Sequence, residues 1–218
     1  MAAPPEPSTR GAIARVYNEI ATEYSRARTT PWPAVLEFID TLPPRSRVLD
    51  AGCGHGRHAA PLLEGGHVVV GLDASMGLLD IARGALPSAS FALGDVCRLP
   101  LRDRAFTAAI AAAVIHHLPS EGERLQALRE IARVLAPRSR ALVTVWAREQ
   151  SRFDDVVEGP RGSGDVWVPW RAGGREVLRF YHLFVDNELS GLVLKAGLRV
   201  AKYFRSGDNY VAVAERHG

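Results

Sequence analysis

Apolar residues follow two different periods along the chain. Over residues 12–26 they recur three or four positions apart, which predicts an amphipathic helix. A second, shorter helix is predicted over residues 34–41, where prolines bound the apolar positions on both sides. Residues 10–42 therefore form a helical extension ahead of the main fold.

From residue 47 onward, short apolar runs alternate with helical patterns. This order is that of parallel βαβ units, and a solid apolar run such as 67–72 is typical of a strand buried on both faces. The predicted strands are 47–51, 67–72, 89–93, 106–113, 141–146, 199–204 and 210–214, and the predicted helices are 57–64, 75–84, 121–135 and 187–196. We expect an α/β fold: a doubly wound, mostly parallel seven-stranded sheet with an antiparallel C-terminal strand.

Two segments fall outside this alternation. Residues 1–9 are predicted to be a disordered tail, and residues 148–176, rich in Gly, Arg and Asp, a lid-like insertion. The chain has 218 residues, of which 47% are hydrophobic, so we expect a single domain over 10–218. There is no run of membrane-span length and no signal-peptide pattern, so we expect a location in the cytoplasm, and also in the nucleus if the source is a eukaryote.

Charge and cysteine content narrow the chemistry only a little. A net charge of +3 and a pI near 9.1 permit an anionic partner such as RNA without requiring one. Cys53 and Cys97 show neither a CxxC pair nor zinc-ligand spacing, so we predict no metal site. Buried, reduced thiols are the simplest interpretation of both.

The densest chemical signal is the turn after the first strand. Gly52, Gly54 and Gly56 stand at alternate positions directly behind Asp50. Glycine at this density indicates a sharp turn or a close approach of the backbone to a ligand. A dinucleotide site would have the spacing GxGxxG, whereas the spacing here is GxGxG.

Two further carboxylates follow the next two predicted strands. Asp73 ends the second strand about twenty residues beyond the turn, the distance at which a carboxylate meets ribose hydroxyls. Asp95 follows the third strand. Taken singly, Asp73 could be the N-cap of the next helix and Asp95 a turn residue. The two together with the glycine turn favour a nucleoside cofactor.

These motifs resemble those of the class I S-adenosylmethionine-dependent methyltransferases. The resemblance implies that Asp50 and the turn at residues 52–56 hold the methionine part of the cofactor, that Asp73 accepts from the ribose, and that Asp95 and the Val96 backbone meet the adenine edge. The residues implied to bind S-adenosylmethionine are Asp50, Gly52, Cys53, Gly54, Gly56, Asp73, Ala74, Asp95, Val96 and Ala113.

Four strings farther along resemble a narrower family. They are YNEIA at 17–21 with Arg26, Arg28 and Trp32 after it, VIHHL at 114–118, VTVWAREQ at 143–150, and DVWVPW at 165–170 with RFYH at 179–182. Their order is similar to that of the tRNA wobble-uridine methyltransferases of the yeast tRNA methyltransferase nine and AlkB homologue eight type. The resemblance implies methylation of the carboxylate of 5-carboxymethyluridine in tRNA, giving a methyl ester and S-adenosylhomocysteine.

That reaction needs positioning groups rather than a general base, because a carboxylate is already ionised at neutral pH. We expect His116, Trp146 and Tyr181 to shape a pocket for a flipped uridine, and Arg179 or a nearby arginine to hold the substrate carboxylate or a phosphate. The other residues expected to contact the substrate are Tyr17, Arg26, Arg28, Trp32, Trp170 and His182.

Structural roles compete with these functional ones. The alternatives are backbone capping for His116 and His117, packing for Tyr17 and Trp146, and a solvated face for Arg26 and Arg28. Trp167 and Trp170 lie in a polar segment with little core, which favours a contact role for both.

The family resemblance also implies a partner. Stand-alone members, the type we expect here, work with a small zinc-binding activator protein of the tRNA methyltransferase 112 type. In the usual strand order the third strand, residues 89–93, lies at an edge, and it is apolar and uncharged. We expect a heterodimer through this strand. The rival interpretations are a small-molecule methyltransferase and a non-catalytic, cofactor-binding scaffold.

Overall fold

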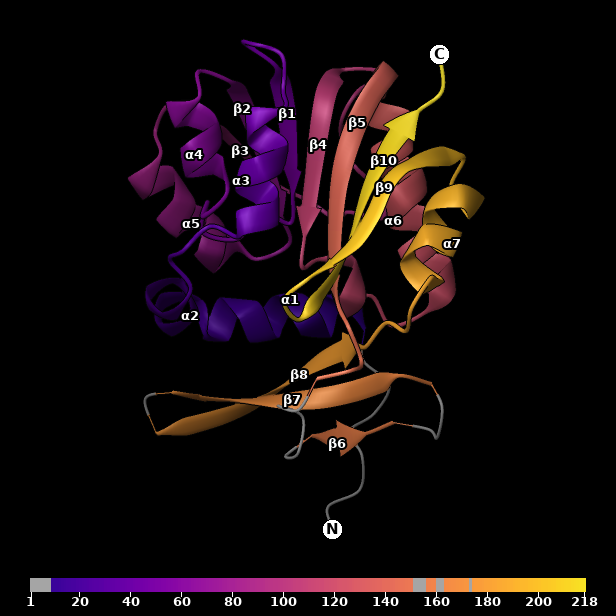
Figure 1. The fold of residues 1–218 in the computed structure, drawn as a ribbon. Helices are drawn as coiled ribbons and strands as arrows, with labels where there is room; N and C mark the ends of the chain where they lie inside the picture. Colours follow the sequence, from indigo (N-terminus) through magenta and orange to yellow (C-terminus); the bar gives the residue numbers. More distant parts are fainter. Residues whose placement is uncertain (1–8, 151–155, 160–162, 173) are drawn as a thin grey trace.

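The computed structural model describes residues 9–150, 156–159, 163–172 and 174–218, and their arrangement is shown in Figure 1. The elements in chain order are α1 (Arg10–Glu19), α2 (Ala21–Ala27), α3 (Pro33–Asp40), β1 (Arg47–Ala51), α4 (Ala59–Glu64), β2 (Val68–Asp73), α5 (Met76–Ala85), β3 (Ser90–Leu93), β4 (Phe106–Ala112), the 3₁₀ turn η1 (Ile115–His117), α6 (Glu121–Val134), β5 (Leu135–Trp146), β6 (Val157–Glu158), β7 (Asp165–Ala172), β8 (Arg175–His182), α7 (Glu188–Lys195), β9 (Leu198–Ser206) and β10 (Asn209–Arg216).

The main sheet has the predicted α/β architecture. Its strand order is β3-β2-β1-β4-β5-β10-β9. The strands β1 to β5 pair in parallel, and β10 runs antiparallel to both β5 and β9. The reversal of strand order falls between β1 and β4, and in such sheets ligands bind at the carboxyl ends of the strands on either side of that point. The glycine turn follows β1 at this position.

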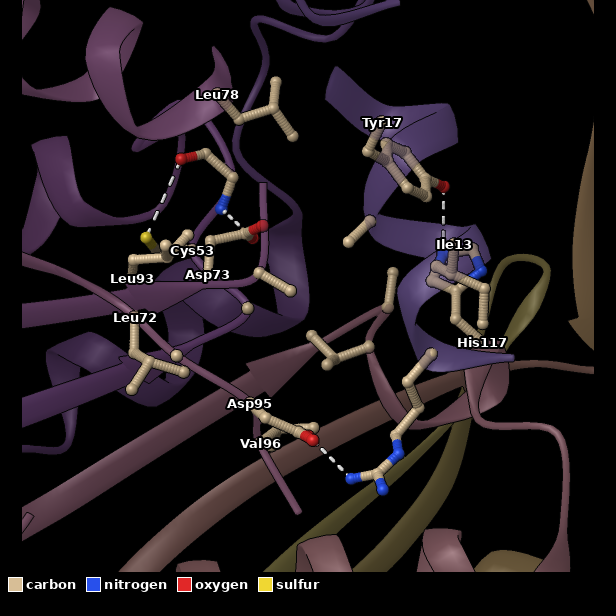
Figure 2. A pocket seen from close by; sticks show the side chains of 18 of the residues that line it. Ile13, Tyr17, Cys53, Leu72, Asp73, Leu78, Leu93, Asp95, Val96 and His117 are labelled. Carbon is tan, nitrogen blue, oxygen red and sulfur yellow. Dashed lines mark hydrogen bonds and ion pairs between the residues drawn. The ribbon is translucent and has the colours of Figure 1, made fainter. Parts of the chain in front are cut away.

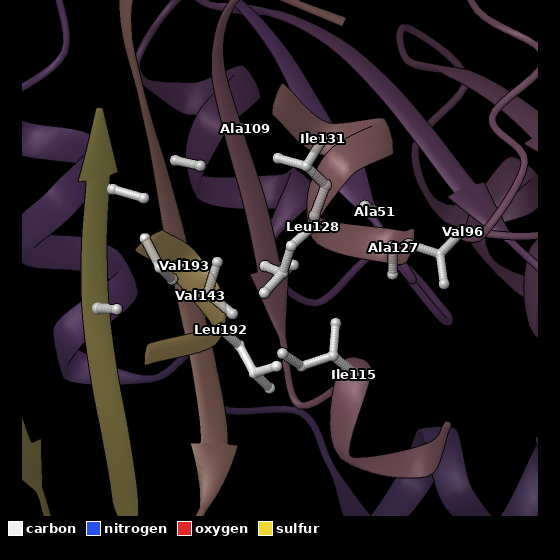
Figure 3. Close-up of a cluster of buried hydrophobic side chains, with 14 of the residues drawn as sticks. Ala51, Val96, Ala109, Ile115, Ala127, Leu128, Ile131, Val143, Leu192 and Val193 are labelled. Carbon is white, nitrogen blue, oxygen red and sulfur yellow. The ribbon is translucent and has the colours of Figure 1, made fainter. Parts of the chain in front are cut away.

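Both faces of the sheet are covered, which explains the solid apolar runs. Leu128 and Ile131 of α6 and Leu192 of α7 pack on one face, as Figure 3 shows. Val35 of α3 and Leu62 of α4 pack on the other. Successive strand residues alternate between these two cores because strand side chains have a period of two. None of the helices in the described ranges is long and apolar enough to cross a membrane.

The N-terminal extension differs from the prediction in two ways. The helix expected over 12–26 is two helices that break at Ile20, whose backbone leaves the helical region at φ −98° and ψ 7°. Thr9 was assigned to the tail but is the N-cap of α1, and its side chain accepts from the Ala12 N–H; residues 1–8 lie outside the described ranges. Both helices lie across the carboxyl end of the sheet (Figure 1).

The predicted lid-like insertion contains a second sheet. The strands β6, β7 and β8 pair antiparallel, and β8 continues to His182, beyond the expected end of the insertion. In Figure 1 this sheet lies on the far side of α1 from the main sheet. The two histidines of the VIHHL string lie in the single turn η1, and α6 begins at Glu121, as predicted, behind a Ser120 capping box.

Candidate functional site: two adjoining cavities

In the turn after β1, packing requires glycine at two of the three glycine positions, and the third position has room for a side chain. Gly52, Gly54 and Gly56 all have positive φ, at +73°, +55° and +87°. A Cβ on Gly52 would lie 2.3 Å from a Val114 methyl carbon, and one on Gly56 2.8 Å from Leu86 Cδ1. A Cβ on Gly54 would meet nothing closer than 3.8 Å. Gly54 therefore exposes its backbone to the cavity beside it.

Asp73 ties this turn to the end of β2. Its carboxylate accepts from the Gly54 N–H and the Ser75 N–H, each at 2.8 Å, and a dashed line at Asp73 in Figure 2 marks a hydrogen bond of this carboxylate. The N-cap of α5 is Ser75, whose hydroxyl accepts from the Leu78 N–H, so Asp73 is not the capping residue. Burial raises the pKa of Asp73. The carboxylate keeps further lone pairs for hydroxyl donors.

Asp95 both shapes a turn and lines the same cavity. Its carbonyl accepts from the Arg98 N–H at 2.9 Å, and its Oδ1 accepts from the Cys97 N–H at 2.8 Å. Its Oδ2 pairs with Arg10 of α1, a residue that no sequence pattern singled out. Arg10 also lies 3.0 Å from the Glu123 carboxylate. Helix α1 is thereby fastened over the rim of the cavity.

This first cavity has a volume of about 320 Å³. Every residue predicted to bind the cofactor lines it except Asp50 and Gly56. Asp50 is only 1% exposed, and its Oδ2 has no hydrogen-bond partner; burial and then the neighbouring Asp73 raise its pKa to about 7. Burial also raises the pKa of Cys53, so its thiol is protonated and a poor nucleophile.

A second cavity of about 350 Å³ opens beside the first. The two share four lining residues: Tyr24, Arg57, Ala113 and His117. Six residues predicted for catalysis or substrate binding line the second cavity: Arg28, Trp32, His116, Trp146, Arg179 and Tyr181. The two cavities therefore adjoin at these four residues.

Stacked aromatic rings form one wall of the second cavity. The Trp146 ring at the end of β5 and the Tyr181 ring of β8 are parallel within 3°, with centroids 4.2 Å apart. His116 packs against both rings, and its Nδ1 accepts from the Trp146 N–H at 3.0 Å. Since that nitrogen is an acceptor, the neutral ring carries its proton on Nε2. The arrangement fixes both the orientation and the tautomer of His116.

His117 and Tyr17 connect the two cavities. The His117 Nδ1–H donates to the Phe180 carbonyl at 2.9 Å, so its Nε2 accepts from the Tyr17 hydroxyl at 3.0 Å. Burial lowers the pKa of His117 to about 3, which keeps the ring neutral. The Tyr17 hydroxyl also lies 3.4 Å from that of Tyr181. Tyr17 lines the first cavity rather than the second and packs α1 against β8.

Arg179 is a buried cation in the wall of the second cavity. It is 5% exposed, and its Nε has no hydrogen-bond partner. The guanidinium lies 4.9 Å from the centroid of the Trp170 ring and 5.2 Å from that of Tyr181. Arg28 lies 5.8 Å from the same Trp170 ring. Among the described residues no carboxylate forms an ion pair with Arg179, and a buried cation of this kind favours an anionic ligand.

Three residues predicted to bind substrate lie outside both cavities. Arg26 is exposed on the last turn of α2. His182 is held between Asp165 and Glu188, at 2.8 and 2.7 Å, which ties β8 to β7 and α7 and leaves neither ring nitrogen for a ligand. Trp170 does not reach the cavity but supports Arg28 and Arg179. Trp167, expected in a contact role, is 8% exposed and packs on Phe180.

Several functional positions were missed from the sequence. Arg57 follows the glycine turn directly, and its place there was the one available signal. Asn18 accepts from the Ser75 hydroxyl and the Gly77 N–H, at 2.8 and 2.9 Å, and so holds α1 against α5. Tyr24 lines both cavities. The roles of Asn18 and Tyr24 depend on how α1 and α2 pack over the sheet, which no local pattern encodes.

Comparison with known proteins agrees with this geometry. Residues 49–143 match a family model described as a methyltransferase domain. A methyltransferase described as SAM-dependent, from Methanosarcina mazei, has the same fold with a TM-score of 0.73 and 19% identity, over 86% of this chain and 99% of its own. Residues 49–143 thus match a methyltransferase domain, and the structural neighbour shares the fold of the chain.

A closer relationship appears in the sequence. The tRNA (carboxymethyluridine(34)-5-O)-methyltransferase of Schizosaccharomyces pombe is 34% identical over 94% of this chain and 96% of its own length. The chain belongs to the family of tRNA (carboxymethyluridine(34)-5-O)-methyltransferases. A chain of the complex between the Haloferax volcanii Trm112 methyltransferase activator and a putative methyltransferase shares the fold, with a TM-score of 0.69 and 16% identity over 94% of this chain.

Proposed function

We propose that this protein uses S-adenosylmethionine to convert the carboxylate of 5-carboxymethyluridine, at the wobble position of tRNA, into its methyl ester. The cofactor occupies the first cavity, where its ribose hydroxyls and adenine amine are donors for Asp73 and Asp95. Gly54 lets the backbone approach the methionine part. When bound, the cofactor supplies an activated methyl group on sulfur. The S. pombe relative, which is named for this reaction, supports the assignment of the substrate.

The observation that carries the proposal is the meeting of the two cavities at Tyr24, Arg57, Ala113 and His117. An acceptor held in the second cavity would meet, at these four residues, the methyl group that a cofactor held in the first cavity would supply. A carboxylate oxygen would form the new bond to the methyl carbon as the bond from carbon to sulfur breaks, with S-adenosylhomocysteine as the other product. No proton moves, which fits a junction at which His117 is neutral and already committed to two hydrogen bonds. Alignment and exclusion of water supply the rate enhancement.

The second cavity provides the groups that this acceptor requires. Arg28 and Arg179 hold the carboxylate, because both guanidinium groups lie over the Trp170 ring and line this cavity or its wall. The Trp146–Tyr181 stack offers an aromatic surface to the flipped base. His116 keeps the Trp146 backbone in place through its Nδ1.

The exposed edge of the main sheet supports the proposal of a partner. Strand β3 pairs only with β2 in the described sheet, and its last residue, Leu93, is 49% exposed. An unprotected apolar edge favours pairing with another chain. We place a small zinc-binding activator subunit on this edge, and the Trm112 complex among the structural neighbours gives a precedent for this fold.

The test is methyl transfer from labelled S-adenosylmethionine to tRNA that lacks the terminal methyl ester, with and without the activator, followed by digestion to nucleosides. We expect labelled 5-methoxycarbonylmethyluridine, more product with the activator, and co-elution of the two proteins. A matched tRNA that carries the neutral 5-carbamoylmethyluridine should gain no label, because it offers no carboxylate. Label in both tRNAs, or in a different nucleoside, would contradict the proposal.

A further inference from the structure

Arg57 occupies a position that neither the proposed acceptor site nor the predicted cofactor site uses. It follows Gly56 directly and lines both cavities at their junction. Its guanidinium lies 5.1 Å from the centroid of the Trp32 ring. That ring supports the guanidinium on one side without neutralising its charge.

Arg57 has no counter-ion among the residues that the structure describes. No carboxylate of the described part of the chain forms an ion pair with it. Asp50 attracts it from a distance, but burial and Asp73 raise the pKa of Asp50 to about 7, so Asp50 is only partly ionised at neutral pH. Burial lowers the pKa of the Arg57 guanidinium itself. A half-buried cation in this position is stabilised by an anion that enters with a ligand.

The charged groups around the first cavity show where that anion belongs. Asp73 and Asp95 line the first cavity but not the second, and Arg10 beside Asp95 is already paired. Arg57 is thus the one arginine lining this cavity, among the described residues, that makes no ion pair. Asp73 and Asp95, whose carboxylates can accept from hydroxyl and amine groups, lie away from the junction of the two cavities, and the Arg57 guanidinium lies at that junction.

The chemistry of the cofactor matches this polarity. Its reactive sulfur must face the second cavity, and its amino-acid carboxylate is joined to that sulfur by a short carbon chain. The carboxylate therefore lies near the junction when the nucleoside end lies at Asp73 and Asp95. We propose that Arg57 binds the amino-acid carboxylate of S-adenosylmethionine and of its product, which leaves Arg28 and Arg179 for the acceptor carboxylate. This inference rests on the proposed function for the identity of the cofactor.

The experiment compares two ligands that differ only in that carboxylate. Binding of S-adenosylhomocysteine and of its decarboxylated form, 5′-deoxy-5′-(3-aminopropylthio)adenosine, is measured by calorimetry on the full chain. We expect Arg57→Gln to weaken binding of S-adenosylhomocysteine by about 30-fold, because charge-assisted hydrogen bonds are lost. Binding of the decarboxylated ligand should change by less than about twofold. Arg57→Lys should restore part of the loss because the charge remains.

Two further variants serve as controls. Arg47→Gln, at the amino end of β1 and away from both cavities, should leave the affinity for both ligands unchanged. Arg179→Gln should also spare both affinities, since Arg179 lines only the second cavity. Thermal melting of each variant separates a loss of binding from a loss of folding.

The outcomes are distinct. Equal weakening of both ligands by Arg57→Gln would overturn the inference, and so would unchanged binding of S-adenosylhomocysteine accompanied by a raised KM for tRNA. A wild-type protein that binds neither ligand would overturn the cofactor assignment together with this inference. A wild-type protein that binds both ligands but methylates no tRNA would overturn only the acceptor part of the proposed function.

Discussion

The two cavities are built in different ways, although they share a wall. The first consists mainly of backbone turns and short carboxylates at the ends of neighbouring parallel strands. Asp73 ends β2, and Asp95 follows the adjacent strand β3. The second consists of long side chains from α2, η1, β5 and β8, which are distant in sequence. The backbone of the fold therefore forms most of the proposed cofactor cavity, whereas the proposed acceptor cavity depends on particular arginine and aromatic side chains. Substitutions in the two cavities should therefore have different effects on stability, on cofactor binding and on methyl transfer.

The largest effect is expected at the glycine turn, where Gly52 has no room for a side chain. Gly52→Ala places a Cβ 2.3 Å from Val114 Cγ2 and strains a φ of +73°, which should cost about 2–4 kcal/mol of unfolding free energy. Gly54→Ala has room and should cost only about 1 kcal/mol, from its positive φ alone. Thermal melts should show a drop of roughly 5–15 °C for Gly52→Ala. Equal drops for both variants would mean that backbone strain alone, without the Val114 contact, sets the stability of the turn.

The next effect should appear in the second cavity and leave the first untouched. Arg179→Gln removes a buried cation that stacks on Trp170 at 4.9 Å and should lower kcat/KM for tRNA by about 100-fold. The Kd for S-adenosylhomocysteine should stay within about twofold, because Arg179 does not line the first cavity. Steady-state kinetics and calorimetry on the same preparation measure the two quantities. Full-rate methylation of tRNA by this variant would remove Arg179 from the acceptor site.

The same contrast explains what the sequence could predict. The parallel strands, the glycine turn, Asp73 and Asp95 were predictable because each is coded locally: an apolar run ends, and the polar residues that follow lie at the carboxyl end of a strand. The aromatic and arginine residues of the second cavity were predictable only as strings that resemble a known family. Their arrangement depends on β8, which returns Arg179 and Tyr181 from a second sheet that no periodicity indicated.

Residues with partners far along the chain were the hardest to place. His182 was expected at the substrate, but Asp165 and Glu188 hold both its nitrogens. Tyr17 was also expected at the substrate, and the structure shows that its hydroxyl group, on α1, hydrogen-bonds to His117 of η1. Arg57 was overlooked because its significance arises only where two cavities meet. In each case a hydrogen bond or a cavity that spans distant segments decides the role.

A moderate effect is expected from His58, which lines the first cavity and packs at 5.9 Å against Trp32 of the second. Burial, then Arg57 and His55, lower its pKa to about 3. Between that value and its ordinary pKa near 6.5, the unfolded chain binds a proton that the folded protein does not. Stability is therefore fully present above pH 6.5 and falls with decreasing pH, by about 1.4 kcal/mol per pH unit for this residue.

His58→Gln should remove that part of the pH dependence. Urea unfolding at several values between pH 4.5 and 7.5 measures the slope for the wild type and the variant. The wild-type slope below pH 6.5 should exceed that of the variant, while the two should run parallel above it. Parallel curves throughout would show that His58 keeps its ordinary pKa in the folded protein, so that the wall of the first cavity would gain a positive charge below about pH 6.5.

The smallest effect should come from two arginines on either side of Ala27. Arg28 leaves α2 at its C-cap, with φ −129° and ψ 58°, and lines the second cavity, whereas Arg26 stays on the helix and lines neither cavity. Arg28→Gln should lower kcat/KM for tRNA by about tenfold, and Arg26→Gln by less than about threefold, through long-range attraction alone. The effect of Arg26→Gln should vanish at high salt, whereas part of that of Arg28→Gln should persist, because Arg28 lines the second cavity and is proposed to contact the acceptor carboxylate directly. Equal effects that fade together with salt would mean that both arginines act only by general charge, and that the second cavity recognises its anion through Arg179 alone.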